Sequence, residues 1–224
     1  MKSKQALCAL SLALCAGASH AALTAFTSRS AFDAAISGLA AVQTEDFEGL
    51  SAGTTFASGA GANGLTYSYA IPGYSLQVSD TFGTTSGVNY LGLDNPDTAF
   101  YLGDSFTIGF GRTVQAVGLY LITGSDAQAG DLQLSVASGS VFNSATPDTL
   151  VSDGQAFFLG LVESDPGQGF TTATVSGIPS GDAFLAFSAD DITSATVSAV
   201  PEPSSWALMG AGLGLLAWCR RRRA

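Results

Sequence analysis

The sequence predicts an all-β fold, namely an antiparallel β-sandwich of jelly-roll type with a short N-terminal helix and a C-terminal hydrophobic helix. From Gln43 onward, short runs of Val, Ile, Thr, Phe and Tyr are separated by Gly, Asn, Asp, Ser and Pro, which is typical of strands joined by tight turns. No long helical segment separates these runs, so a parallel sheet with crossover helices is disfavoured. Two packed sheets are preferred to a closed barrel, and the lack of a fixed-period repeat disfavours a solenoid.

A short accessory helix is expected at residues 31–37, ahead of the strands. Ser30 is a residue type that caps helix N-termini, and Asp33 stands at the third helical position, where a carboxylate completes such a cap. Gly38 then ends the helix, because glycine readily adopts the left-handed conformation that follows a last helical turn.

The clearest strand is expected at residues 105–110, where three large apolar side chains alternate with Ser, Thr and Gly and therefore share one face. Residues 114–122 follow after Gly111 and Arg112 and are apolar on both faces, which predicts a fully buried strand and a hairpin between the two. Further strands are expected at residues 65–70, 132–136, 155–161, 170–176, 183–188 and 195–199.

The N-terminus has the composition of a secretory signal peptide. Lys2 and Lys4 precede an apolar stretch at residues 6–18, and small residues follow it. Signal peptidase is expected to cleave between Ala21 and Ala22, so residues 1–21 form the signal peptide and residues 22–199 the β-sandwich domain.

The C-terminus, residues 200–224, is a separate segment. It begins with a short motif in which a glutamate stands between two prolines (Val200, Pro201, Glu202, Pro203). Near its end are four consecutive arginines (Arg220, Arg221, Arg222, Arg223). Between them, Trp206 to Cys219 is an uncharged, mostly apolar run that would span about 21 Å as a helix, against about 30 Å for a bilayer core. The two tryptophans as interfacial anchors and the arginines as a cytoplasmic stop nevertheless favour a membrane helix. A core helix is the weaker alternative, because the run has no polar face.

This combination resembles the PEP-CTERM sorting signal of Gram-negative bacteria. The resemblance rests on Pro201, Glu202 and Pro203, the apolar run and the arginine tail, all at the extreme C-terminus and behind a signal peptide. It implies that an exosortase-like enzyme processes the segment near the Pro-Glu-Pro triplet, in an organism that makes exopolysaccharide. The stay in the inner membrane is then transient, and the protein is released to the cell surface or the extracellular matrix of a biofilm.

The region between the two ends is strongly acidic and chemically restricted. Lys2, Lys4 and the four tail arginines are six of the eight basic residues, whereas all 18 acidic residues lie between Asp33 and Glu202. Nucleic acid and anionic lipid are therefore excluded as partners, and divalent cations are favoured. Apart from the signal peptide and the tail, the chain has no Lys, His, Cys or Trp. Disulfides, His or Cys zinc sites and His-dependent nucleophiles are thus excluded there.

Two acidic pairs are candidate calcium ligands. Asp46 and Glu48 would share one face of a strand while Phe47 points to the other, and Asp190 with Asp191 precedes the last strand. Antiparallel sandwiches often place first and last strands side by side, and Ca²⁺ takes about six to eight oxygen ligands. This arrangement resembles carbohydrate-binding and galactose-binding jelly-roll modules, and the resemblance implies a structural calcium held by Glu48 and Asp191. Solvated turn carboxylates are an equal alternative.

The leading functional hypothesis is a non-enzymatic surface or matrix protein that binds exopolysaccharide. Tyr67 and Tyr69 are the candidate ligand-binding residues, because tyrosines at i and i+2 present adjacent rings on one sheet face. The preferred alternative is that both rings pack against the other sheet. Two further functions remain open, namely a glycosidase using Asp46 and Glu48 as its carboxylate pair, and self-assembly through protein contacts.

Overall fold

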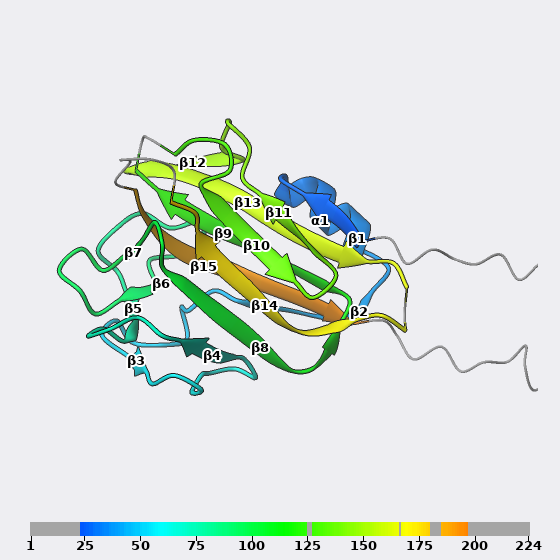
Figure 1. Ribbon diagram of the computed structural model, residues 1–224, viewed down its shortest axis with the longest axis horizontal. Coiled ribbons are helices and arrows are strands. Elements are labelled where there is room, and N and C mark those ends of the chain that lie inside the picture. The colour runs from blue at the N-terminus through cyan, green and yellow to red at the C-terminus, as the bar shows by residue number, and fades with distance from the viewer. Residues whose placement is uncertain (1–22, 125–126, 166, 180–184, 197–224) are drawn as a thin grey trace, which may run out of the picture.

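The computed structural model describes residues 23–124, 127–165, 167–179 and 185–196. Within them, two antiparallel sheets pack face to face (Figure 1), which confirms the predicted antiparallel β-sandwich with a short helix. The larger sheet runs β1 (Leu23–Phe26), β13 (Gly154–Glu163), β9 (Ala116–Thr123), β15 (Ala186–Thr196), β6 (Tyr90–Leu93), β5 (Leu76–Ser79) and β3 (Thr55–Phe56). β12 (Thr149–Val151) pairs with β13, and β2 (Ala40–Glu45) and β7 (Phe100–Tyr101) pair with β15. The smaller sheet runs β11 (Gly139–Phe142), β10 (Leu132–Val136), β14 (Phe170–Gly177), β8 (Ser105–Val114) and β4 (Thr66–Tyr69).

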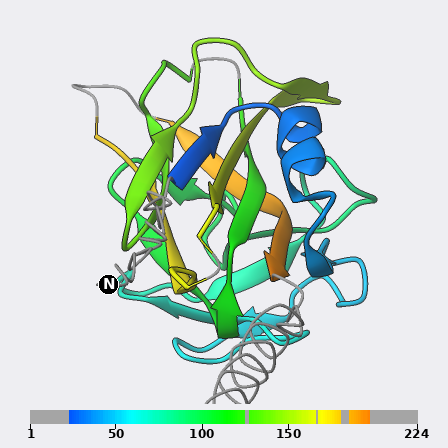
Figure 2. The ribbon, with the colours of Figure 1, turned by 90° about the vertical axis from the view of Figure 1, so that its right-hand side faces the viewer.

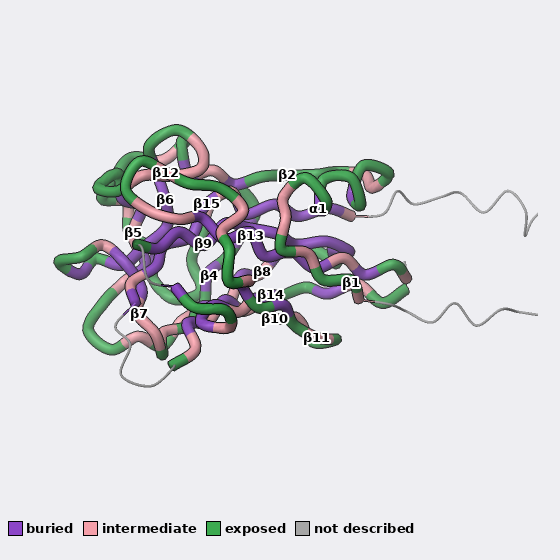
Figure 3. Tube along the Cα trace, turned by 90° about the horizontal axis from the view of Figure 1, so that it is seen from above, coloured by how far each residue is buried: buried purple, intermediate pink, exposed green. Residues whose placement is uncertain are grey.

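The main core lies between the two sheets. In β8 the side chains of Phe106, Ile108 and Phe110 are buried while the residues between them are not, as the alternating sequence predicts. Every residue of β9 is buried, because its inner face lies in the main core and its outer face lies under the helix. The central strands consequently form the buried middle of the molecule in Figure 3.

The predicted hairpin between residues 105–110 and 114–122 is wrong. β8 extends to Val114 in the smaller sheet, and β9 starts at Ala116 in the larger one. The chain crosses between the sheets at Gln115, whose backbone N–H donates to the carbonyl of Ala195. β8 and β9 therefore belong to opposite layers, where both can bury an apolar face against the main core.

Helix α1 (Arg29–Ile36) covers the outer face of the larger sheet, and it begins two residues earlier than the predicted range of 31–37. Ser28, rather than Ser30, occupies the N-cap position, and its side chain makes no capping hydrogen bond. Asp33 pairs instead with Arg29 one turn before it, at 2.8 Å. The position of the helix is set by the burial of Phe32 and Ile36 rather than by a cap.

The sequence predicts strands at residues 183–188 and 195–199, with Asp190 and Asp191 between them. In the structure this acidic pair does not separate two strands. It lies within the single strand β15, at a β-bulge where the pairing with β9 shifts by one residue. Asp191 has a φ of 54° there. Two residues occupy the place of one, so core-facing positions change from Phe187 and Ala189 before the bulge to Ile192 after it.

The start of β1 and the end of β15 lie at the same end of the sandwich, which faces the viewer in Figure 2. In the described part of the chain, no helix has the length and apolar character needed to cross a membrane. The predicted signal peptide with its Ala21–Ala22 cleavage site, the hydrophobic helix from Trp206 to Cys219 and the arginine tail all lie outside the described residues.

Candidate functional site

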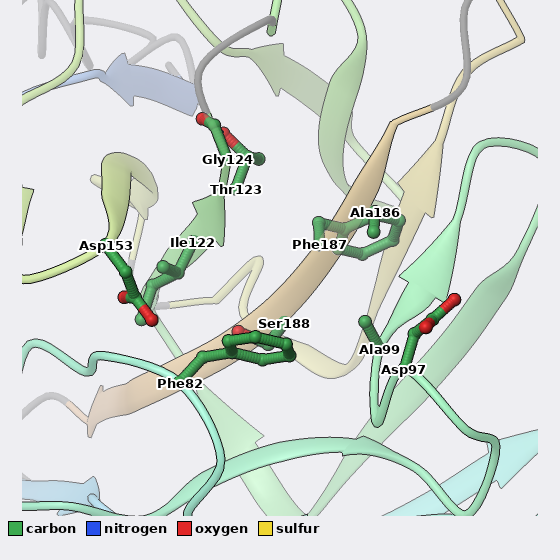
Figure 4. A pocket seen from close by; sticks show the side chains of 10 residues that line it. All are labelled: Phe82, Asp97, Ala99, Ile122, Thr123, Gly124, Asp153, Ala186, Phe187 and Ser188. Carbon is green, nitrogen blue, oxygen red and sulfur yellow. The ribbon is translucent and has the colours of Figure 1, made fainter.

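A cavity of about 320 Å³ opens at the other end of the larger sheet, where β15 begins and β9 ends (Figure 4). The strands supply its floor and the adjoining loops its rim. The lining residues are Phe82, Asp97, Ala99, Ile122, Thr123, Gly124, Asp153, Ala186, Phe187 and Ser188. Most of this lining is apolar, and its two charged side chains are both carboxylates.

Phe82 is the exposed aromatic residue of the cavity. It lies in the loop of residues 80–89 between β5 and β6, and 46% of its surface is exposed. Its ring stacks on the buried ring of Tyr90, with centroids 6.4 Å apart and planes 27° from parallel. The Tyr90 hydroxyl is hydrogen-bonded to that of Thr98. One face of the Phe82 ring is thus supported by the fold, and the residue contributes an apolar surface to the cavity.

The middle of the 80–89 loop is held by two carboxylates, one from the turn between β12 and β13 and one from β15. Asp153 accepts the backbone N–H of Gly83 at 2.8 Å. Asp190, which is fully buried, accepts the backbone N–H groups of Thr85 and Ser86 at 3.0 and 3.1 Å, together with both hydroxyls. These bonds fix the segment that carries Phe82, so the aromatic rim of the cavity is positioned before any ligand arrives.

Asp97 and Asp153 lie on opposite sides of the cavity, with Phe82 between them in Figure 4. The Tyr101 hydroxyl donates to Asp97, and this hydrogen bond is the main reason that the pKa of Tyr101 is raised to about 12. Asp153 uses one oxygen for Gly83 as described. No arginine or lysine among the described residues lines the cavity, so its electrostatic potential is set by these two carboxylates.

The structure brings the two predicted calcium ligands to the same loop. Glu48 accepts the backbone N–H groups of Val88 and Asn89 at 2.7 and 2.6 Å, and Asp191 accepts the Thr85 hydroxyl at 2.9 Å. The predicted strand through Asp46 and Glu48 is wrong, because β2 ends at Glu45 and the chain turns there. Glu45 accepts the Phe47 N–H at 2.9 Å across this turn, and Phe47 is buried at a positive φ of 60°.

Calcium binding at Glu48 and Asp191 stays a prediction. Among the described residues, no three Asp, Glu, His or Cys side chains are grouped as a metal site requires. If a structural calcium is present, the melting temperature of the protein should be several degrees higher in millimolar CaCl₂ than in excess chelator, because a ligand bound only to the folded state stabilises it. Equal melting temperatures, measured by circular dichroism, would refute the site.

The predicted tyrosine platform is open to solvent at only one of its two rings. Tyr67 and Tyr69 do share one face of β4, but this face packs against the main core, and Tyr67 is fully buried against Phe56 with centroids 5.3 Å apart. The Tyr69 hydroxyl donates to the carbonyl of Phe56 at 2.7 Å. Burial raises the pKa of Tyr67 far above its usual value. Tyr67 packs as the alternative interpretation predicts, whereas Tyr69 is partly exposed.

Residues 199–223 match the family model described as the PEP-CTERM protein-sorting motif. The chain carries a PEP-CTERM sorting motif. The prediction made from Pro201, Glu202 and Pro203 is therefore confirmed. The PEP-CTERM motif implies an exported protein that is processed by an exosortase-like enzyme, and a destination at the cell surface of a Gram-negative bacterium. No curated protein sequence matches the chain, so the activity of the domain ahead of the PEP-CTERM motif is inferred from its geometry.

The residues of the cavity were not identified as a site from the sequence. Asp97 and Asp153 stand in segments with strong turn signals, Asp94-Asn95-Pro96-Asp97 and Asp153-Gly154, and those signals account for them without a ligand. Phe82 is one of 14 phenylalanines, and nothing in its neighbourhood distinguishes it from a core residue. The segments that carry Phe82, Asp97 and Asp153 come together through long-range strand pairing, of β13 with β9 and of β15 with β9, β6 and β7.

Proposed function

We propose that the exported domain is a non-enzymatic glycan-binding module of the cell surface or extracellular matrix, with the Phe82 cavity as its binding site. The PEP-CTERM motif supports the location, since it directs the protein outside the cell. The cavity supports the binding role. The observation that carries the proposal is the half-exposed Phe82 ring, held between a supporting aromatic and an open cavity.

The chemistry of a pyranose suits this cavity. One face of a sugar ring is a flat array of C–H groups, which packs on an aromatic ring, while its hydroxyls donate to carboxylates. The rim supplies Phe82 for the first contact and Asp97 and Asp153 for the second. A cavity of about 320 Å³ lies at the lower limit of small-molecule sites, which favours one or two sugar units of a chain over a larger ligand.

Replacing Phe82 with alanine tests the proposal. The wild-type full chain, solubilised in mild detergent, should bind hexamers of glucose, N-acetylglucosamine or glucosamine in calorimetric titrations. Phe82→Ala should weaken binding about tenfold, because the loss of one aromatic contact of about 1.4 kcal/mol changes the dissociation constant by that factor.

Phe142→Ala is the matched control. Phe142 is 45% exposed, nearly the same as Phe82, and lies on β11 in the smaller sheet, away from the cavity. Its replacement should leave the dissociation constant unchanged. If no oligosaccharide binds, or if both variants lose affinity equally, the proposal is wrong. Cleavage of the oligosaccharides that disappears in Glu48→Gln would instead favour the glycosidase.

A further inference from the structure

We propose that the glycan recognised by the Phe82 cavity carries free amino groups, so that it is cationic at neutral pH. This inference rests on the proposed function and names the class of sugar that the same site selects. Its basis is the charge of the cavity, where Asp97 and Asp153 stand on opposite sides of an apolar floor.

The two carboxylates lack a compensating positive charge in the cavity. The hydrogen bond that Asp97 accepts from Tyr101 and the one that Asp153 accepts from Gly83 come from neutral groups. Both residues are exposed at the rim, and negative charges there repel uronic acids and sulfated or phosphorylated sugars and attract an ammonium group. A neutral glycan would pack on Phe82 but would form no ion pair with the two carboxylates.

The two arginines among the described residues make their contacts outside the cavity. Arg29 pairs with Asp33 on α1 and lies over the ring of Phe158, 5.7 Å from its centroid. Arg112 donates to the side chain of Gln43 at 2.6 Å. Against these two arginines the described residues contain fifteen carboxylates. The field of the whole domain therefore draws a cationic polymer towards the surface and repels an anionic one.

An amino sugar fits the floor of the cavity better than a lysine-rich peptide does. The floor is formed by Ala99, Ile122 and Phe187, of which Phe187 is buried and stacked on Phe100 at 5.2 Å between centroids. A glucosamine unit carries its ammonium group directly on the ring that packs against Phe82. It therefore presents a rigid apolar face and a positive charge together, whereas a lysine must order a flexible chain to do so.

The experiment compares sugar hexamers of positive, zero and negative charge. By calorimetric titration at pH 6.5 and low salt, the full chain should bind glucosamine hexamer at least tenfold more tightly than N-acetylglucosamine hexamer, and glucuronate hexamer should not bind. The preference should largely disappear in 0.5 M NaCl, because salt screens the partly exposed charges. Asp97→Asn and Asp153→Asn should each reduce the preference for the glucosamine hexamer severalfold, because its affinity falls by a larger factor than the affinity for the acetylated hexamer.

Asp33→Asn is the charge-matched control, since it removes one carboxylate from an exposed position on α1 and should leave the preference unchanged. Equal affinity for the glucosamine and acetylated hexamers would overturn this inference and leave the proposed function intact. Failure of every hexamer to bind would overturn both. Binding of hexalysine that is as tight as that of glucosamine hexamer and persists in Phe82→Ala would show that the site selects charge without a sugar, which also contradicts the inference.

Discussion

Replacing Phe32 with alanine is expected to lower the free energy of unfolding by about 3 to 5 kcal/mol. Phe32 is fully buried between α1 and the larger sheet, where it contacts Phe158 at 5.1 Å and Phe26 at 6.0 Å between ring centroids. It lies over Gly118 and Gly160, which are directly paired across β9 and β13. Because these glycines carry no side chains that can fill the space, the truncated site would remain a cavity.

Urea denaturation followed by circular dichroism measures this loss. Phe142→Ala, at an exposed position, is the control and should change the free energy of unfolding by no more than about 1 kcal/mol. Gly160→Val should be destabilising for the opposite reason, because its Cβ would lie 2.6 Å from an atom of the Phe32 ring. If Phe32→Ala unfolds like the control, α1 does not contribute to the stability of the domain.

Stability is expected to fall as the pH rises from about 4 to about 7, by at most about 4 kcal/mol. Burial, and next the charge of Asp191, raise the pKa of Asp190 from 3.8 to about 7, although the groups that donate to it lower the pKa in part. Below pH 4 this side chain is protonated in both the folded and unfolded states. Between pH 4 and 7 only the unfolded state loses the proton, so the folded state becomes relatively less stable. Above pH 7 the effect is complete.

Denaturation curves between pH 4 and 8 check this dependence, with Asp191→Asn as the informative variant. Removing the neighbouring negative charge lowers the pKa of Asp190, so the fall in stability should become smaller and end at a lower pH. Tyr120 lies opposite Asp190 on the neighbouring strand β9. Its hydroxyl donates to Asp148 at 2.8 Å, and it does not ionise in this range because its pKa is raised. A rise in stability from pH 4 to 7 would contradict the assignment.

The sequence predicts the sandwich because its long strands bury one or both faces. Their patterns of apolar and polar residues can therefore be recognised. β8, β9, β13 and β14 were all expected close to their observed positions. The sequence does not predict β1, β3, β5, β6, β7, β11 or β12, because strands of two to four residues carry too little pattern to be recognised. The crossing of the chain at Gln115 was missed for a different reason, since sheet membership depends on contacts between distant segments.

The candidate site was harder to predict than the fold. Glu48 and Asp191 were expected near each other, and both do contact the 80–89 loop, but as acceptors for its backbone and hydroxyl groups. Tyr67 and Tyr69 share a face as expected, yet the period of a strand does not say which face is buried. Phe82, in contrast, lies in a loop whose position depends on contacts with distant residues, such as the bond from Gly83 to Asp153.

The strand β15 runs from the proposed binding cavity towards the sorting motif. It starts in the floor of the cavity at Ala186 and ends at Thr196, and its 11 residues span roughly 35 Å. The PEP-CTERM match begins at residue 199, only three positions later. The proposed binding cavity and the last described residue before the sorting motif therefore lie at opposite ends of one strand, so cleavage at the motif would leave the cavity intact.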